Sequence, residues 1–406
     1  MRGDRRHCRD RRAEVDGLLL LFGGVLVLFF VINVWICPVC VWCCPGVVQL
    51  VNFEAGPDGS GARGVFTASV TFFDLGEHQV TLVVGGAVLR RREDGKELPN
   101  IYQKREMNVT VVGECPAAPT RRCNVAETLR AGGVGRWKDD RWTPVDCYFT
   151  QYSQEEAFAL LSQQRHLIVI GDSYLRGIFR GFVATAEDRE FYDATIGSPR
   201  ISVPIGSLDQ PQYVVRIGDS LLEFHGYSSC GQIPVYPNMI VGPKTLVLHG
   251  LGVHEISGRK PNQPWTDFDE EDLLAWNQKV NGDAHECVQR LAPLFKYLNS
   301  PRHFMYSVPH YNIGFRKPAD YSFQGVAIIR WTRSYLNAMR SFADQATVFD
   351  HRRVTAGVPD KWHKDGHHYQ PPVTDQMANM LYNYFELTDE MTDEEFKAAL
   401  PEPLDG

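Results

Sequence analysis

The sequence lacks an excess of positive charge, an internal repeat and a long low-complexity tract. Its 406 residues carry 42 Lys and Arg against 49 Asp and Glu, which gives a formal net charge of −7. A chain without a basic balance offers no global reason to expect nucleic acid, so we predict no such partner. Without a repeat of roughly 20–50 residues, solenoids and propellers are disfavoured. The length allows two or three ordinary globular domains.

Charge is also missing from a long stretch near the N-terminus. Gly17–Ile36 is 20 residues without a charge, enough to cross a bilayer core of about 30 Å as a helix. It is longer and bulkier than the apolar core of a cleaved signal peptide. Six arginines precede it: Arg2, Arg5, Arg6, Arg9, Arg11 and Arg12. The positive-inside rule therefore predicts a single-pass type II membrane protein, with a cytosolic tail (1–16), a transmembrane signal anchor (17–44) and a lumenal remainder.

The 10 cysteines are unevenly placed, and one of them, Cys8, precedes the uncharged stretch. Four follow the predicted anchor: Cys37, Cys40, Cys43 and Cys44. A zinc knuckle is the alternative there, but no downstream ligand pair has zinc spacing, which favours lipid-facing free thiols that can be acylated. Five more lie in the predicted lumenal part: Cys115, Cys123, Cys147, Cys230 and Cys287. Since five is odd, one stays free or pairs between chains. Cys115–Cys123, which closes a short loop, is the preferred bridge, and the remaining pairings stay open.

A β-pattern extends from about residue 47 to 113. The stretch "VFTASVTFFDLGEHQVTLVVGGAVL" alternates apolar and polar residues between glycine-rich and acidic turns, which predicts a small all-β domain of immunoglobulin or filamin type. Asn108 begins an Asn-Val-Thr sequon, so we predict a glycan on it. Nothing in this domain has a catalytic pattern, and a protein partner is the role left for it. A connector rich in Pro, Gly and Arg follows over 114–154.

From about residue 155 the pattern changes to apolar runs that alternate with helical stretches. The runs are Leu167–Ile170, Thr245–His249, Phe304–Val308 and Thr347–Asp350. Strands that alternate with helices predict an α/β domain over 155–388 with a doubly wound, mostly parallel sheet, followed by an acidic tail over 389–406. Reactive groups in such sheets gather beyond the carboxyl ends of the strands.

The tripeptide Gly-Asp-Ser occurs twice in this domain. Ser173 follows the apolar run "HLIVIGD" and precedes a helical stretch, so it is predicted to lie at a helix N-terminus, where backbone N–H groups favour negative charge. Ser220 lies in "QYVVRIGDSLLEFHGY", between two strand-like runs. That context predicts a tight hairpin turn with a structural serine. Ser173 is therefore the predicted nucleophile.

A serine nucleophile needs a base and a group that orients the base. The segment "VPDKWHKDGHHYQPP" holds two overlapping Asp-x-x-His pairs, Asp360/His363 and Asp365/His368. We prefer Asp365 and His368, because the amphipathic stretch "TDQMANMLYNYFEL" follows at once and would anchor them to the core. A metal held by His363, His367 and His368 is the alternative.

Acyl transfer also needs donors for an oxyanion. The block "TLVLHGLGVHEI" places Gly252 and His254 just after a predicted strand. Gly252 leaves room for substrate and can direct its N–H into the site. His254 either donates to the oxyanion or binds substrate, or it is an ordinary loop histidine. Arg176 could bind an anionic group, although a helix-surface arginine is the commoner explanation.

These motifs resemble those of the SGNH (GDSL-like) hydrolases. The segments "VIGDSYLRG", "GLGVH" and "DGHHY" are most similar to the PC-esterase branch, which includes plant-wall polysaccharide O-acetyltransferases and the Golgi sialate O-acetyltransferase. The upstream "GRW" and "WTPVDCYF" with the β-domain are similar to the neurexophilin and PC-esterase-domain (NXPE) family. The resemblance implies an SGNH-like fold in which Ser173 is the nucleophile, Asp365 and His368 complete the triad, and Gly252 belongs to the oxyanion block. Generic SGNH enzymes have asparagine where this chain has His254, a departure the PC-esterase branch shares.

Two functional hypotheses follow. The first is a membrane-anchored carbohydrate O-acyltransferase, by preference an O-acetyltransferase, or an esterase, with its catalytic domain lumenal in the Golgi or secretory pathway or at the cell surface. It would use an acyl-serine intermediate, no cofactor, a glycan or other hydroxyl acceptor, and an acyl donor such as acetyl-CoA. The second is a non-catalytic, neurexophilin-like binding protein. The presence of all three triad residue types favours the enzyme. The sequence does not distinguish transfer to a sugar from hydrolysis.

Overall fold

The structure is a computed structural model that describes residues 13–17, 29–36, 53–54, 66–70, 76–85, 102–111, 118–138, 140–187, 213–233, 242–257, 270–298, 300–309, 324–356, 358, 362 and 368–401. The chain divides into two compact units, Met1–Ala117 and Ala118–Gly406. Each is described separately below.

The first unit contains strands, arranged in two antiparallel sheets of three. One sheet has the order β1 (Ala13–Gly17), β4 (Phe66–Val70), β3 (Phe53–Glu54). The other has the order β2 (Phe29–Ile36), β5 (Gly76–Gly85), β6 (Tyr102–Val111). Asn108 lies in β6 opposite Gln79. The sheets account for the β-pattern of the sequence, and the immunoglobulin or filamin type stays a prediction.

The predicted transmembrane helix is wrong for its second half. Phe29–Ile36 forms β2, and each of its residues is paired with β5, as Ile32 is with Leu82. The segment "FFVINVWI" is rich in aromatic and β-branched residues, which favour strands, and β5 offers an apolar partner strand. Residues 18–28 lie outside the described part. Among the described residues, no helix is both long and apolar enough to cross a membrane.

The second unit is built on a six-stranded sheet in the order β10-β11-β9-β12-β13-β14. The strands are β9 (His166–Gly171), β10 (Tyr213–Ile217), β11 (Ser220–Gly226), β12 (Thr245–Gly250), β13 (Phe304–Ser307) and β14 (Thr347–Phe349). All neighbours are parallel except the edge strand β10, which is antiparallel to β11. The predicted α/β class with a mostly parallel sheet is confirmed.

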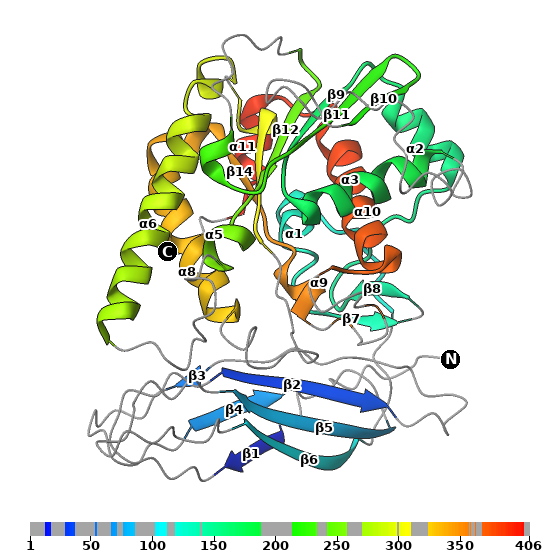
Figure 1. Cartoon of the computed structure of the whole chain (residues 1–406). Helices are drawn as coiled ribbons and strands as arrows, with labels where there is room; N and C mark the ends of the chain where they lie inside the picture. The colour runs from blue at the N-terminus through cyan, green and yellow to red at the C-terminus, as the bar shows by residue number, and fades with distance from the viewer. Residues whose placement is uncertain are drawn as a thin grey trace, which may run out of the picture. The chain divides into compact units, whose positions relative to one another are not determined.

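Helices cover both faces of this sheet (Figure 1). On one face, α3 (Ser173–Ala186) and α10 (Pro371–Thr388) pack on Val169 and Leu248 in the main core. On the other, α8 (Gln324–Ala338) places Tyr335 against His249, with α6 (Glu270–Leu291) beside it. The central strands are buried on both sides, which explains their continuous apolar runs.

Shorter elements complete the unit. The helices are α1 (Val125–Leu129), α2 (Gln154–Leu161), α5 (Val253–Ser257), α9 (Arg352–Ala356) and α11 (Asp393–Ala399). The 3-10 turns are η1 (Cys230–Gln232), η3 (Leu294–Lys296), η4 (Pro301–His303) and η5 (Met339–Gln345). A hairpin of β7 (Gly135–Lys138) and β8 (Arg141–Pro144) precedes the main sheet in the chain.

The preferred Cys115–Cys123 bridge is wrong, because Cys123 bonds Cys147, with 4.9 Å between their Cα atoms. The two chain segments run side by side there, since Cys123 N–H donates to Tyr148 and Tyr148 N–H donates to Arg121. This pairing brings the cysteines together across 24 residues of sequence, which a preference for the shortest loop cannot foresee. A second disulfide joins Cys230 to Cys287, and Cys115 lies outside the described residues.

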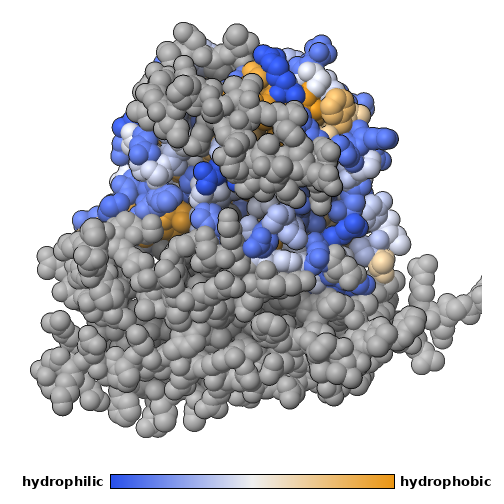
Figure 2. Space-filling model, turned by 45° about the vertical axis from the view of Figure 1, so that its right-hand side comes forward, coloured by the Kyte–Doolittle hydropathy of each residue, from blue (hydrophilic) through white to orange (hydrophobic). Residues whose placement is uncertain are grey.

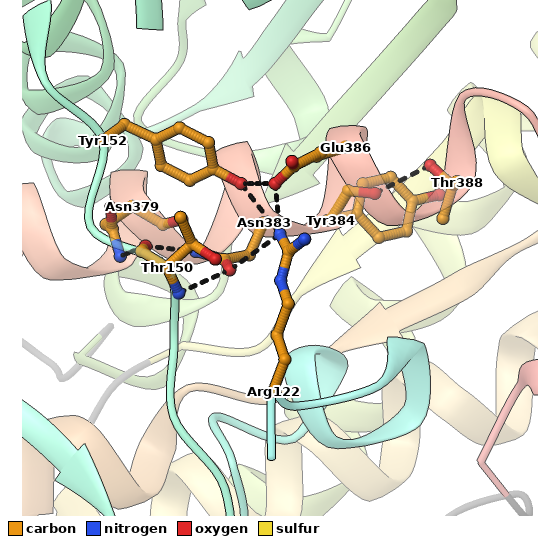
Figure 3. A network of polar contacts seen from close by, with 8 residues as sticks. All are labelled: Arg122, Thr150, Tyr152, Asn379, Asn383, Tyr384, Glu386 and Thr388. Atoms are coloured by element: carbon orange, nitrogen blue, oxygen red, sulfur yellow. Dashed lines mark hydrogen bonds and ion pairs between the residues drawn. The ribbon is translucent and has the colours of Figure 1, made fainter. Parts of the chain in front are cut away.

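Residues 118–152, which the sequence places in a connector, are fastened to α10 by a polar network (Figure 3). The Arg122 guanidinium bonds Tyr152, Asn383 and Glu386. Asn379 and Asn383 donate their side-chain amides to the carbonyl of Thr150, each at 2.9 Å. The beginning of the second unit is thus held against the helix near its end.

The described surface of the second unit is mostly hydrophilic in the view of Figure 2, with small apolar areas. The large hydrophobic side chains that are exposed include Tyr148, Phe158 and Leu274. Scattered residues of this kind are ordinary on a protein surface, so they do not indicate a partner.

Candidate active site

Ser173 lies just beyond the carboxyl end of β9, as the first residue of α3. The turn depends on its two predecessors. A Cβ on Gly171 would lie 2.5 Å from the carbonyl oxygen of Gly250, so only glycine fits between the strand ends. Asp172 then caps the helix by accepting a hydrogen bond from Tyr174 N–H at 2.9 Å. The sequence Gly-Asp-Ser therefore ends a buried strand and begins a helix within three residues.

His368 contacts the predicted nucleophile directly. Its Nε2 lies 2.9 Å from Ser173 Oγ, although the residues are 195 positions apart. The imidazole is stacked on the ring of Tyr174, with centroids 5.5 Å apart. His368 precedes α10 by a few residues, and both it and Ser173 are partly buried. The structure thus brings together the serine and the histidine that the sequence singles out.

Ser173 and His368 have the geometry of a nucleophile and its base. For Nε2 to accept the serine proton, the other ring nitrogen must carry the imidazole hydrogen, which needs an acceptor. Asp365 is the residue predicted to supply it. Asp365, Asp360, His363 and His367 lie outside the described residues, so the orienting carboxylate, the second Asp/His pair and the metal alternative stay predictions.

Gly252 occupies a position that excludes any side chain. Its φ of +137° is one that L-residues rarely adopt, and a Cβ there would lie 2.2 Å from Nε1 of the buried Trp331. Its carbonyl accepts from Ile256 N–H at 2.9 Å, which begins α5. The glycine is therefore required by packing against Trp331. Its role toward an oxyanion stays a prediction.

His254 lies on α5 close enough to His368 for the two imidazoles to interact electrostatically. Partial burial lowers the pKa of His254, and the positive charge of protonated His368 lowers it further. A neutral His254 is a hydrogen-bond donor that adds no charge to the site. Arg176 is half-buried on α3, and its charge acts on Asp172. A contact of Arg176 with substrate stays a prediction.

Two buried carboxyls were not singled out from the sequence: Asp172, which precedes Ser173, and Glu255, whose charge acts on Asp172. Burial raises the pKa of Asp172 to about 7, with a smaller contribution from the charge of Glu255, while the hydrogen bond from Tyr174 opposes the shift. Burial likewise raises the pKa of Glu255, whose Oε1 accepts from Cys230 N–H at 2.7 Å. The position of Asp172 just before a predicted helix could have indicated its capping role. No sequence pattern indicates that Glu255 is buried.

Two other serines test this assignment by contrast. Ser220 follows the turn of the β10–β11 hairpin and is fully buried. Its hydroxyl accepts from Arg165 N–H at 2.7 Å and donates to the Leu161 carbonyl, which is the structural role predicted for it. Ser307 Oγ lies 2.9 Å from His351 Nε2, a serine–histidine contact that the sequence did not reveal. Ser307 and His351 are only 2% and 1% exposed, so a substrate cannot reach them.

No family model matches the chain, and no curated protein matches it. Two solved structures are similar to part of it. One is a member of the lipolytic protein G-D-S-L family from Veillonella parvula DSM 2008, at 12% identity and a TM-score of 0.32, with 56% of this chain and 100% of that chain covered. The other is a lipase/acylhydrolase from Enterococcus faecalis, at 13% identity and a TM-score of 0.28, with 59% and 100% covered. Likenesses this distant carry no weight for the chemistry, which rests on the site itself.

Proposed function

We propose that the second unit is a serine-dependent acyl-transfer enzyme, an esterase or an O-acyltransferase. The observation that carries the proposal is the 2.9 Å contact between Ser173 Oγ and His368 Nε2 at the carboxyl end of β9. A half-buried serine with a base in hydrogen-bond reach at a helix N-terminus is the minimum that acyl transfer requires.

In the first half-reaction, Ser173 Oγ attacks the acyl carbon of the donor while its proton passes to His368 Nε2. The negative charge that develops on the acyl oxygen would be stabilised by the N-terminus of α3 and by donors near Gly252 and His254. The bond from the acyl carbon to the leaving oxygen or sulfur then breaks, and His368 returns its proton to the leaving group. The product is an acyl-serine.

In the second half-reaction, His368 takes the proton of an incoming hydroxyl, whose oxygen attacks the acyl-serine and releases Ser173. Water as acceptor gives hydrolysis, and a sugar hydroxyl gives O-acyl transfer. The finer proposal is a carbohydrate O-acetyltransferase that uses a donor such as acetyl-CoA. It is supported by the resemblance of "GLGVH" and "DGHHY" to the PC-esterase branch.

The test uses the purified full chain with 4-nitrophenyl acetate, with an acetylated sugar, and with radiolabelled acetyl-CoA plus a desialylated or sialylated glycan. We expect turnover of at least one acetyl donor and covalent labelling by a fluorophosphonate. Label transferred to glycan identifies a transferase, whereas acetate release alone identifies an esterase. If neither turnover nor labelling is seen, the non-catalytic binding protein becomes the better hypothesis.

We also propose that this unit lies in the lumen of the secretory pathway. The disulfides Cys123–Cys147 and Cys230–Cys287 support this, because such bonds persist in oxidising compartments.

For this location we expect that protease added to sealed microsomes spares the second unit. An endoglycosidase should shift the full-length protein by one glycan on a gel, and Asn108→Gln should remove that shift. Detergent, which opens the vesicles, is the control that must restore digestion. Cleavage of the second unit in sealed vesicles would place it in the cytosol and remove secretory glycans as substrates.

A further inference from the structure

The β7–β8 hairpin lies in the stretch that the sequence places in a connector, yet two of its tryptophans are buried. Trp137 and Trp142 are a cross-strand pair, and their side chains are only 3% and 2% exposed. Their rings meet edge to face with centroids 6.2 Å apart. Figure 1 shows the hairpin beside α9, the helix that precedes the segment carrying His368. Both tryptophans pack in the core, and Trp137 in addition contacts residues on the path to His368.

Trp137 forms a hydrogen bond with the C-terminal part of α9. Its indole N–H donates to the Val354 carbonyl at 2.8 Å. Val354 belongs to the last turn of this short helix, and the N–H of Val358, four residues on, bonds Thr355 instead. The terminal carbonyls of a helix need partners from outside it. Trp137 supplies one where the chain leaves α9 toward His368.

Trp137 also contacts Trp362, which lies between α9 and His368 in the chain. Its ring packs edge to face on Trp362, with centroids 4.8 Å apart. The carbonyl of Trp362 accepts from Gln370 N–H at 2.7 Å, which closes the segment on itself. Gln370 follows His368 by two residues. The indole of Trp137 therefore contacts both Val354 in α9 and Trp362, the residue that bonds Gln370.

We propose that Trp137 is a positioning residue for His368, an inference that rests on the proposed function. Through Trp362, whose carbonyl bonds Gln370, Trp137 keeps His368 Nε2 within hydrogen-bond reach of Ser173 Oγ. A displacement of about 1 Å at a catalytic group can cost on the order of 100-fold in rate. The Trp142 indole N–H donates to Ala131 instead. Trp142 also bonds Gln376 on α10, but through its backbone N–H at 3.3 Å, which a change of side chain leaves in place.

The experiment compares Trp137→Phe with Trp142→Phe in the full chain. Each variant removes one buried indole hydrogen bond and a similar volume, so both should lower Tm by a similar few degrees. We expect Trp137→Phe to lower kcat on 4-nitrophenyl acetate roughly 10- to 100-fold with little change in KM. Trp142→Phe should stay within about threefold of the wild type. The imidazole resonances of His368 in histidine-labelled protein should change only in Trp137→Phe.

Equal losses of kcat in the two variants, or a loss confined to KM, would overturn the positioning role while leaving the proposed function intact. Absence of any Ser173-dependent turnover in the wild type would overturn the proposed function instead. In that case the His368 resonances still decide the inference: a change in Trp137→Phe alone supports it, and the same change in both variants, or in neither, rejects it.

Discussion

Replacing Ser173 with alanine should lower turnover of an acetyl ester by about 10⁴-fold or more and abolish fluorophosphonate labelling. In the proposed mechanism, the substitution removes the hydroxyl that attacks the acyl carbon. The fold should survive, because Ser173 is partly exposed and the cap of α3 comes from Asp172. The measurements are kcat/KM, the mass of the labelled protein and Tm.

Ser220→Ala is the matched control, since it alters the second Gly-Asp-Ser. It leaves the buried Arg165 N–H and the Leu161 carbonyl without the hydroxyl that bonds them. We expect a loss of about 1–3 kcal/mol in the free energy of unfolding, with kcat of the folded protein unchanged. Labelling that persists in Ser173→Ala and disappears in Ser220→Ala would reverse the assignment.

His368→Ala should reduce turnover by several orders of magnitude, because it removes the imidazole that lies 2.9 Å from Ser173 Oγ. Asp365→Asn should also cause a severe loss if Asp365 orients the imidazole, because the amide favours the wrong tautomer. His363→Ala and Asp360→Asn serve as controls from the other Asp-x-x-His pair and should cost little activity. The comparison is made on kcat at constant pH, with Tm measured for each variant.

A mild effect at Asp365 together with a severe effect at Asp360 would assign the orienting carboxylate to the other pair. A severe loss at His363 with a mild one at His368 would contradict the contact that the structure shows. If several histidine variants lose activity and added zinc restores it, the metal alternative gains the support that it lacks at present.

The contact between Ser173 and His368 could be predicted from the sequence because each residue lies in a strong local pattern. An apolar run that stops at glycine predicts β9 and its turn, and the stretch after Ser173 predicts α3. His368 is followed closely by α10, whose apolar positions repeat with helical spacing. The hairpin turn at Gly218, with φ of +55°, was likewise readable from its flanking strands.

The wrong and missing predictions all concern contacts between segments that are distant in the sequence. An uncharged apolar stretch is compatible with either a membrane helix or a paired strand, and only the pairing of β2 with β5 separates the two. The partner of Cys123 depends on which segments lie side by side. No local pattern shows that Trp137 reaches Val354, 217 residues further on, or that Glu255 is buried beside Asp172.

The contacts that form the site join residues far apart in the sequence, so they also determine when the site can form during synthesis. Arg122 bonds Asn383, which lies 261 residues further along the chain. Ser173 contacts His368, which lies 195 residues further along. At about 5–20 residues per second, His368 leaves the ribosome roughly 10–40 s after Ser173. During that time β9, β11 and β12 can pair. The sheet face that α10 later covers is still without that helix. In the proposed mechanism, a nascent chain therefore has Ser173 without His368, and acyl transfer can begin only when synthesis is nearly complete.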